Sequence, residues 1–166
     1  MYNKECPKYK YFPLDEDHPP LTEESYSLSK QVIEAQADCI ARANPDIHIA
    51  SIRTHFVADK KPTLSAEEEV RKDLWGWTNS EAISRAFFLG LEMKEKGVRG
   101  HEAFYIVGPE HCCDGYDAMD LAKRFYPDTP VKTELSRKQG FFSCRKAEQM
   151  LGWKHEGGGA VPEGNW

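Results

Sequence analysis

The fold is decided by residues 25–52, which read SYSLSKQVIEAQADCIARANPDIHIASI. Residues 25–43 contain neither glycine nor proline, and apolar residues recur at helical spacing at Val32, Ile33, Ala37, Ile40 and Ala41, so we predict a helix with one buried face. The run NPD at 44–46 ends this helix, and the alternating, β-branched residues 47–52 predict a buried strand. A helix followed directly by a strand predicts an α/β fold.

The rest of the chain continues this alternation. We predict helices at about 79–96, 116–125 and 143–151, and a buried strand at 103–107. Thr78 and Glu81 have capping-box spacing for the first of these helices, and Gly152 stands at the C-cap of the last. Trp75 and Trp77 alternate as on a strand and are expected to pack in the core. The proline-containing first twenty residues predict an extended lead-in, and residues 59–72 predict a loop or short helix.

Length and composition indicate one globular domain. The 166 residues are 40% hydrophobic and carry a net charge of −5, without a basic cluster that would bind nucleic acid or an anionic membrane. No apolar run approaches the about 20 residues of a spanning helix, and five cysteines without CxxC spacing do not form a disulfide framework. We therefore expect a cytoplasmic protein with reduced thiols, a domain at 1–155 and a disordered tail at 156–166.

Tyr26 and Lys30 are four residues apart at the start of the predicted helix, so their side chains lie on one face with Cβ atoms about 5–6 Å apart. A tyrosine hydroxyl has an unperturbed pKa of about 10, and a nearby ammonium favours the phenolate. Such a phenol can take a proton from an alcohol as hydride leaves the carbon. The same spacing also occurs where an exposed tyrosine simply stacks on a lysine, and spacing alone does not separate the two.

A metal site is not expected. The run His111-Cys112-Cys113-Asp114 offers suitable atom types, but adjacent cysteines rarely bind one tetrahedral ion together, and no second ligand pair completes a set of four. His55 follows the predicted strand and is a candidate site residue. The remaining histidines are expected to be surface or packed side chains: His18, His48, His101 and His155.

Several segments occur in an informative order. PLDEDHPP at 13–20 precedes YSLSK at 26–30, Glu34 and Ala35 follow in the same helix, and the next strand ends at Arg53. LWGWT at 74–78 leads into ISRA at 83–86, AFYIV occupies 103–107, and KAEQMLGWK closes the series at 146–154. In this order the segments resemble the catalytic-tyrosine region, the late helix and strand, and the "K-A-x-x-x-L-G-W-x-P" ending of extended short-chain dehydrogenases/reductases, the NAD-dependent epimerase/dehydratase family. The resemblance covers roughly residues 10–155.

The resemblance implies a partial Rossmann-like, NAD(P)-binding fold with a C-terminal substrate-binding subdomain. It implies that Tyr26 is the acid/base, and that Lys30 lowers its pKa and hydrogen-bonds the nicotinamide ribose. Residues 53–57, including Arg53 and His55, would lie beside the nicotinamide. The implied cofactor is NAD or NADP, and the implied partner is a small-molecule secondary alcohol, with a nucleotide sugar as one candidate.

The chain also departs from the family pattern. Residues 1–24 contain no serine, and Thr22 is too close to Tyr26 to be the upstream hydroxyl that polarises the substrate carbonyl. No G-x-G-x-x-G turn lies between a strand and a helix, so the pyrophosphate site is not encoded. Ala82, where relatives often carry Asp, and the run RTHF at 53–56 argue against a nucleotide-sugar substrate.

From these features we expect NAD(P)-dependent oxidoreduction or epimerisation/dehydration at a secondary alcohol in complete relatives, with this chain incomplete and inactive alone. The alternative is a non-catalytic truncated homologue that acts as a binding or interaction module. An incomplete sheet leaves an open edge, so we also expect self-association. Neither nucleic acid nor a membrane is an expected partner.

Overall fold

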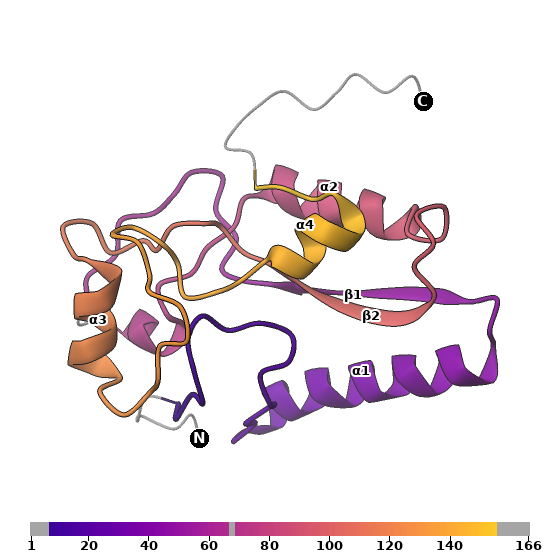
Figure 1. The fold of residues 1–166 in the computed structure, drawn as a ribbon, viewed down its shortest axis with the longest axis horizontal. Coiled ribbons are helices and arrows are strands. Elements are labelled where there is room, and N and C mark those ends of the chain that lie inside the picture. The colour runs from indigo at the N-terminus through magenta and orange to yellow at the C-terminus, as the bar shows by residue number, and fades with distance from the viewer. Residues whose placement is uncertain (1–6, 67–68, 156–166) are drawn as a thin grey trace.

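The computed structural model describes residues 7–66 and 69–155 and has a mixed α/β architecture (Figure 1). Its α-helices are α1 (Ser25–Ala43), α2 (Ser80–Leu91), α3 (Ala118–Phe125) and α4 (Arg145–Leu151). The strands are β1 (His48–Thr54) and β2 (Gly100–Ile106), and a short 3-10 helix, η1 (Glu69–Asp73), lies between β1 and α2. The predicted tail at 156–166 lies outside the described residues.

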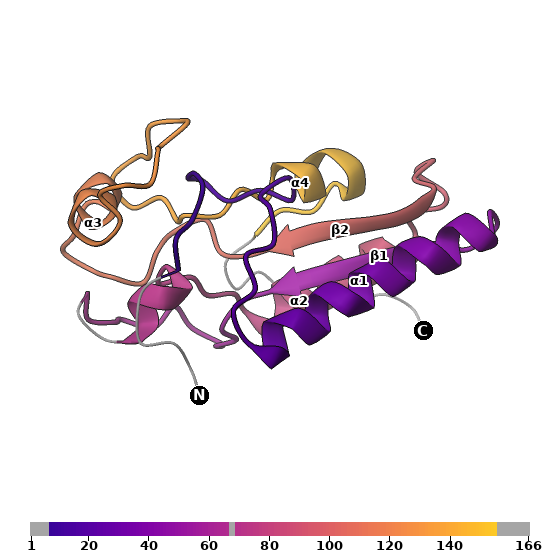
Figure 2. The same cartoon turned by 90° about the horizontal axis from the view of Figure 1, so that it is seen from below.

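Within the described ranges, β1 and β2 form one two-stranded parallel sheet, with pairs running from His48↔Gly100 to Thr54↔Ile106. Helix α2 connects the two strands, which gives a β-α-β unit. Helices α2 and α4 lie on one face of the sheet and α1 lies on the other (Figures 1 and 2). The order of elements predicted from the sequence is confirmed, although most boundaries move by one to five residues.

The face of the sheet under α2 and α4 is a conventional apolar core. Phe104 and Ile106 of β2 are fully buried, together with Trp153, whose indole N–H donates to the carbonyl of Ala82 at 2.9 Å. Gly152 ends α4 in the left-handed conformation, with φ 71°, as its predicted C-cap role requires. Helix α2 is capped by Asn79, whose side chain accepts from the Ala82 N–H at 2.6 Å, so the prediction of Thr78 as the cap is wrong by one residue.

The N-terminal segment does more than lead into α1. Phe12 is fully buried, and its N–H donates to the carbonyl of Pro130 at 2.9 Å, while the Leu14 N–H donates to Phe141 at 2.8 Å. This extended segment therefore packs into a second apolar cluster, which it shares with α3 and with Trp75. The prolines predicted an extended lead-in without core contacts. Phe12 and Leu14 stand on either side of Pro13, and an extended chain can bury both without forming a helix.

The prediction that Trp75 and Trp77 alternate on a strand is wrong, although both are buried as expected. Leu74 and Trp75 have φ of 55° and 49°, in the left-handed region that side chains other than glycine rarely adopt. The chain turns sharply here, and the next residue, Gly76, lies against the His55 ring. A Cβ at position 76 would stand 3.0 Å from that ring, so a larger residue here would have to displace the imidazole.

Helix α1 has its predicted bounds but not its predicted packing. Ala37 and Ala41 are buried as expected, whereas Val32, Ile33 and Ile40 are 47%, 52% and 47% exposed. The alanines and the larger aliphatic residues lie on two different sides of the helix. Both sides are apolar, so the periodicity of the sequence does not determine which of them faces the sheet. The small alanines allow a close approach, and charged side chains beside them reach the strands.

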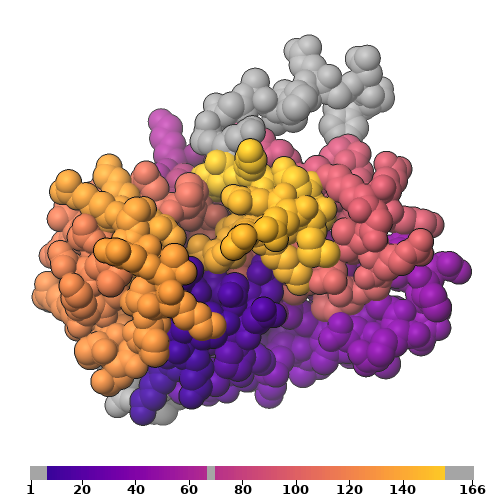
Figure 3. All heavy atoms as spheres, in the orientation of Figure 1, coloured from indigo at the N-terminus to yellow at the C-terminus, as the bar shows by residue number. Residues whose placement is uncertain are grey.

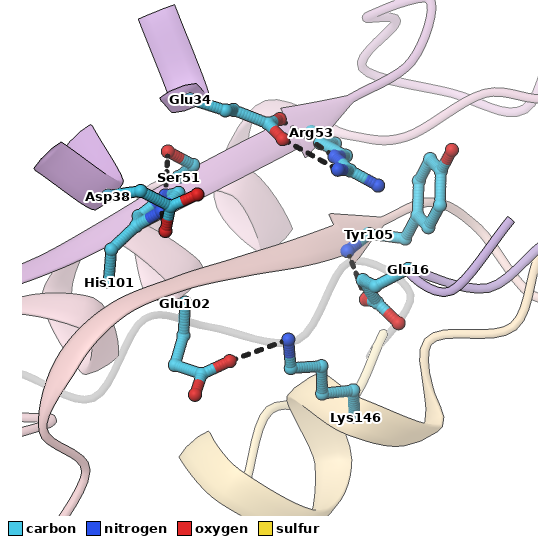
Figure 4. Close-up of polar contacts among 9 residues, drawn as sticks. All are labelled: Glu16, Glu34, Asp38, Ser51, Arg53, His101, Glu102, Tyr105 and Lys146. Carbon is cyan, nitrogen blue, oxygen red and sulfur yellow. Dashed lines mark hydrogen bonds and ion pairs between the residues drawn. The ribbon is translucent and has the colours of Figure 1, made fainter. Parts of the chain in front are cut away.

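Two polar contacts hold α1 on the sheet (Figure 4). Glu34 accepts from Nε and Nη2 of Arg53 at 2.8 and 2.6 Å, a two-point ion pair between α1 and β1. Asp38 binds Nδ1 of His101 at 2.7 Å, and Nε2 of His101 lies 2.8 Å from the Ser51 hydroxyl. Over the described residues, no helix is both long and apolar enough to cross a membrane.

We expect Glu34→Ala to lower the free energy of unfolding by about 1–3 kcal/mol, because it leaves the half-buried Arg53 guanidinium without its carboxylate. Urea unfolding followed by circular dichroism measures this change. Gln36→Ala is the matched control, since Gln36 is exposed on the same helix, and it should change stability by less than about 0.5 kcal/mol. Equal effects of the two substitutions would contradict the proposed role of the ion pair.

Candidate functional site

The candidate site lies where β1 and β2 end. In parallel α/β sheets, ligands bind at the carboxyl ends of the strands. Helix α1 runs back along the sheet against the direction of β1 (Figure 2), so its N-terminus, with Tyr26 and Lys30, lies toward the same end as Arg53 and His55. The Glu34–Arg53 ion pair fixes this alignment.

Tyr26 and Lys30 lie side by side at the start of α1. Glu24 caps this helix by accepting from the Tyr26 N–H at 2.8 Å and from the Ser27 N–H. The Lys30 ammonium lies over the Tyr26 ring, 5.1 Å from its centroid, and Tyr26 is 64% exposed. The spacing therefore produces the contact it predicted, in the form of a cation–π stack. An exposed Tyr–Lys pair without a catalytic role makes the same stack.

Arg53 is engaged by its neighbours rather than free at the end of β1. Its guanidinium forms the ion pair with Glu34 and lies over the Tyr105 ring, 5.2 Å from the centroid. Hydrogen bonding to Glu34 raises the pKa of Arg53 further above its ordinary value. Burial raises the pKa of the Tyr105 hydroxyl, and the charge of Arg53 opposes that rise.

His55 is half-buried just after β1 and is held by backbone groups. The Phe56 N–H donates to Nδ1 at 2.8 Å, so the neutral ring carries its proton on Nε2. Burial lowers the pKa of His55, while Asp73 and the backbone of Asp73 and Gly76 oppose the shift. This environment favours a packed, neutral imidazole. It brings His55 toward the 73–76 turn, and no contact joins it to Tyr26 or Lys30 within the described residues.

Besides Glu34, a second carboxylate, that of Glu16, lies near the end of β2, and no sequence pattern indicated it. Glu16, from the N-terminal segment, accepts from the Tyr105 N–H at 2.7 Å. Burial raises the pKa of Glu16, and the Tyr105 N–H, Lys146 and Arg53 oppose the rise. Lys146 also pairs with Glu102 of β2 at 2.7 Å (Figure 4). Glu16 is 37 to 130 positions from Arg53, Tyr105 and Lys146 in the sequence, and no local pattern links it to them.

The chain Asp38–His101–Ser51 has the hydrogen-bonding order of a Ser-His-Asp catalytic triad. His101 was expected to be a surface or packed histidine, and its side chain is in fact 5% exposed. Ser51 lies at the middle of β1 beneath α1, where its hydroxyl is 2.8 Å from Nε2 of His101. This chain of hydrogen bonds joins α1 to both strands of the sheet.

Residues 111–114 are mainly packed inside the protein, and Asp114 forms an ion pair at the surface. His111, Cys112 and Cys113 are buried. Lys61 bridges Glu110 at 2.8 Å and Asp114 at 3.7 Å at the rim of a cavity of about 40 Å³. Among the described residues, no group of three or more His, Cys, Asp or Glu side chains could hold a metal ion.

Comparison with models of known protein families finds none that matches this chain, and a search of curated proteins finds no matching relative.

The thiols should differ sharply in reactivity, because the thiolate is the nucleophile. Burial raises the pKa of Cys112 and Cys144 to about 12 and also raises that of Cys113, whereas Cys39 is exposed. A thiol with a pKa of about 12 holds roughly a thousandfold less thiolate at neutral pH than an ordinary one. We expect peptide mapping after alkylation of the native protein to find Cys39 labelled long before the other three. Equal labelling rates would contradict the described packing, and labelling in denaturant serves as the control.

We also expect the chain alone to bind NAD(H) and NADP(H) more weakly than micromolar, because it has no glycine-rich turn to hold the pyrophosphate. Isothermal titration calorimetry with each nucleotide measures this. Micromolar binding of either nucleotide would show that another part of the chain supplies a complete cofactor site.

Proposed function

We propose that this chain is the C-terminal part of an NAD(P)-dependent short-chain dehydrogenase or epimerase/dehydratase-like domain, with a partial Rossmann-like fold and a substrate-binding subdomain. Its chemistry would be proton transfer at a secondary alcohol of a small molecule. A nucleotide sugar is one candidate substrate, which Ala82 and the RTHF run disfavour. The chain would be inactive until a dinucleotide-binding half completes it.

The observation that carries the proposal is the placement of the Tyr26–Lys30 pair. The two side chains are in contact and open to solvent, and they belong to a helix whose N-terminus lies toward the carboxyl ends of two parallel strands. That end of a parallel α/β sheet is where substrates and nucleotides bind. A Tyr–Lys pair elsewhere on the surface would give no such support.

The residues fit the nicotinamide end of the cofactor and not its pyrophosphate. Lys30 would hold the ribose, and Arg53 and His55 would form the protein wall behind the ring. The nicotinamide, when bound, accepts the hydride that leaves the alcohol carbon. Tyr26 would take the hydroxyl proton in the same reaction, so that the alcohol becomes a carbonyl. Lys30 would favour the phenolate form needed for this transfer.

A second candidate function is that of a non-catalytic binding module. The observation that favours it is the open outer edge of β1, bordered by exposed apolar side chains of α1 and α2. Such an edge can pair with a strand of another polypeptide without any catalytic step.

Completing the fold tests the first proposal. We expect the chain, fused behind a dinucleotide-binding half with a strand, a G-x-G-x-x-G turn and a helix, to oxidise secondary alcohols with NAD or NADP. Tyr26→Phe should lower kcat by at least about a hundredfold and change cofactor affinity little, because the hydroxyl acts only in proton transfer. Lys30→Ala should weaken both turnover and cofactor binding.

Absorbance of the reduced nicotinamide measures turnover, and calorimetry measures cofactor affinity. Ser29→Ala is the matched control, because Ser29 is exposed between the two residues and binds only the Tyr26 carbonyl at 2.6 Å. Full turnover with Phe at position 26 would contradict the catalytic assignment. A folded fusion that binds cofactor but never turns over would favour the binding-module alternative.

A further inference from the structure

Three aromatic side chains form a row at the carboxyl ends of the two strands. The Tyr105 ring, near the end of β2, lies 5.4 Å from the Phe142 ring, measured between centroids. The Phe142 ring lies 5.2 Å from the ring of His55, which follows β1. All three residues are partly exposed, and the row is uncharged at neutral pH, because burial lowers the pKa of His55 and raises that of Tyr105. We call these three side chains the aromatic row.

The N-terminal segment fixes the middle of this row. The Leu14 N–H donates to the Phe141 carbonyl at 2.8 Å, and the Ser143 N–H donates to the Leu14 carbonyl at 2.7 Å. The two segments therefore lie side by side, as Figure 3 shows for the N-terminal segment and the chain leading into α4. Successive side chains of an extended chain point to opposite sides, so Phe141 enters the core while Phe142 turns toward Tyr105. A ring that is already held in place loses little freedom when a ligand binds.

The Tyr26–Lys30 pair lies at the same level of the sheet as the aromatic row. Both residues precede Glu34 at four-residue steps, so the three side chains share one stripe of α1. Lys30 stands about 6 Å beyond Glu34 along the helix axis. His55 stands about 6–7 Å beyond Arg53 and shares its face of β1, because alternate residues of a strand point the same way. The Glu34–Arg53 ion pair thus sets Lys30 level with His55.

The cations beside the aromatic row are already held by carboxylates (Figure 4). Glu34 holds Arg53 at two points, 2.8 and 2.6 Å, and Glu102 holds Lys146 at 2.7 Å. Glu16 adds another carboxylate at the end of β2. An anionic substrate would have to compete with Glu34 and Glu102 for their cations and would meet the negative charge of Glu16. This end of the sheet therefore suits an uncharged ligand.

We propose that the aromatic row binds the ring of the substrate, and that the substrate is an uncharged secondary alcohol with an aryl group on the hydroxyl-bearing carbon. The inference rests on the proposed function, in which His55 stands behind the nicotinamide. A carbon that gives up hydride has to lie beside the nicotinamide, and the rings next to His55 in the row are those of Phe142 and Tyr105. The aryl ring packs against these two, with its hydroxyl toward Tyr26.

Three ligands of similar size separate the effect of the ring from that of charge. 1-Phenylethanol is aromatic and uncharged, 1-cyclohexylethanol has a saturated ring, and mandelate carries a carboxylate beside the same aryl carbon. We expect ligand-observed NMR titrations of the full chain to give 1-phenylethanol a dissociation constant at least about threefold lower than that of either other ligand. Burial alone would favour the saturated ring, which is the more apolar, whereas contacts between aromatic rings favour the phenyl group.

Phe142→Leu is the test substitution, because it keeps an apolar side chain and removes the ring at the middle of the row. We expect it to abolish the preference for 1-phenylethanol over 1-cyclohexylethanol. Phe88→Leu is the matched control, since Phe88 is 50% exposed on α2, on the other face of the sheet, and should leave the preference unchanged. The comparison of the three ligands on the unmodified chain does not depend on the folding of any variant.

The inference is overturned by a chain that binds none of the three ligands, or that binds 1-cyclohexylethanol or mandelate as tightly as 1-phenylethanol. A folded Phe142→Leu chain that keeps the preference would also overturn it. Its failure is distinct from that of the proposed function. Selective binding of 1-phenylethanol without turnover in the completed enzyme would support the aromatic row and contradict the dehydrogenase chemistry. Turnover of secondary alcohols without preference for an aryl group would do the reverse.

Discussion

The two-point ion pair between Glu34 and Arg53 determines how α1 lies on the sheet, and with it where Tyr26 and Lys30 stand. It fixes the rotation of α1 about its own axis, because the carboxylate can reach the guanidinium only when this side of the helix faces the sheet. Once the rotation is fixed, Ala37 and Ala41 become buried and the larger aliphatic residues turn outward. The same rotation leaves Tyr26 open to solvent.

This polar docking also explains why the two faces of the sheet differ. The face toward α2 and α4 is closed by Phe104, Ile106 and Trp153, which contribute through burial and need no particular partner. The face toward α1 depends on directional contacts at Arg53 and His101. Directional contacts specify one arrangement but bury little apolar surface, so this side gains less stability from apolar burial than the side under α2 and α4.

Much of the fold could be predicted from the sequence, because periodicity, glycine and proline mark the ends of helices and strands. The bounds of α1 and the role of Gly152 followed from such local signals. The burial of Phe12 and the contact between Glu16 and Tyr105 did not, because they join segments about 90 to 120 residues apart. For the candidate site, spacing predicted that Tyr26 and Lys30 would touch, but it could not show that Glu34 engages Arg53.

The contact between Gly76 and the His55 ring links two positions that are far apart in the chain. A side chain at 76 would press against the imidazole, and a smaller residue at 55 would leave a gap beneath the turn. Neither position can therefore vary freely by itself, and a change at one creates room or pressure for a change at the other. In a lineage of such sequences, these two sites would be inherited as a pair.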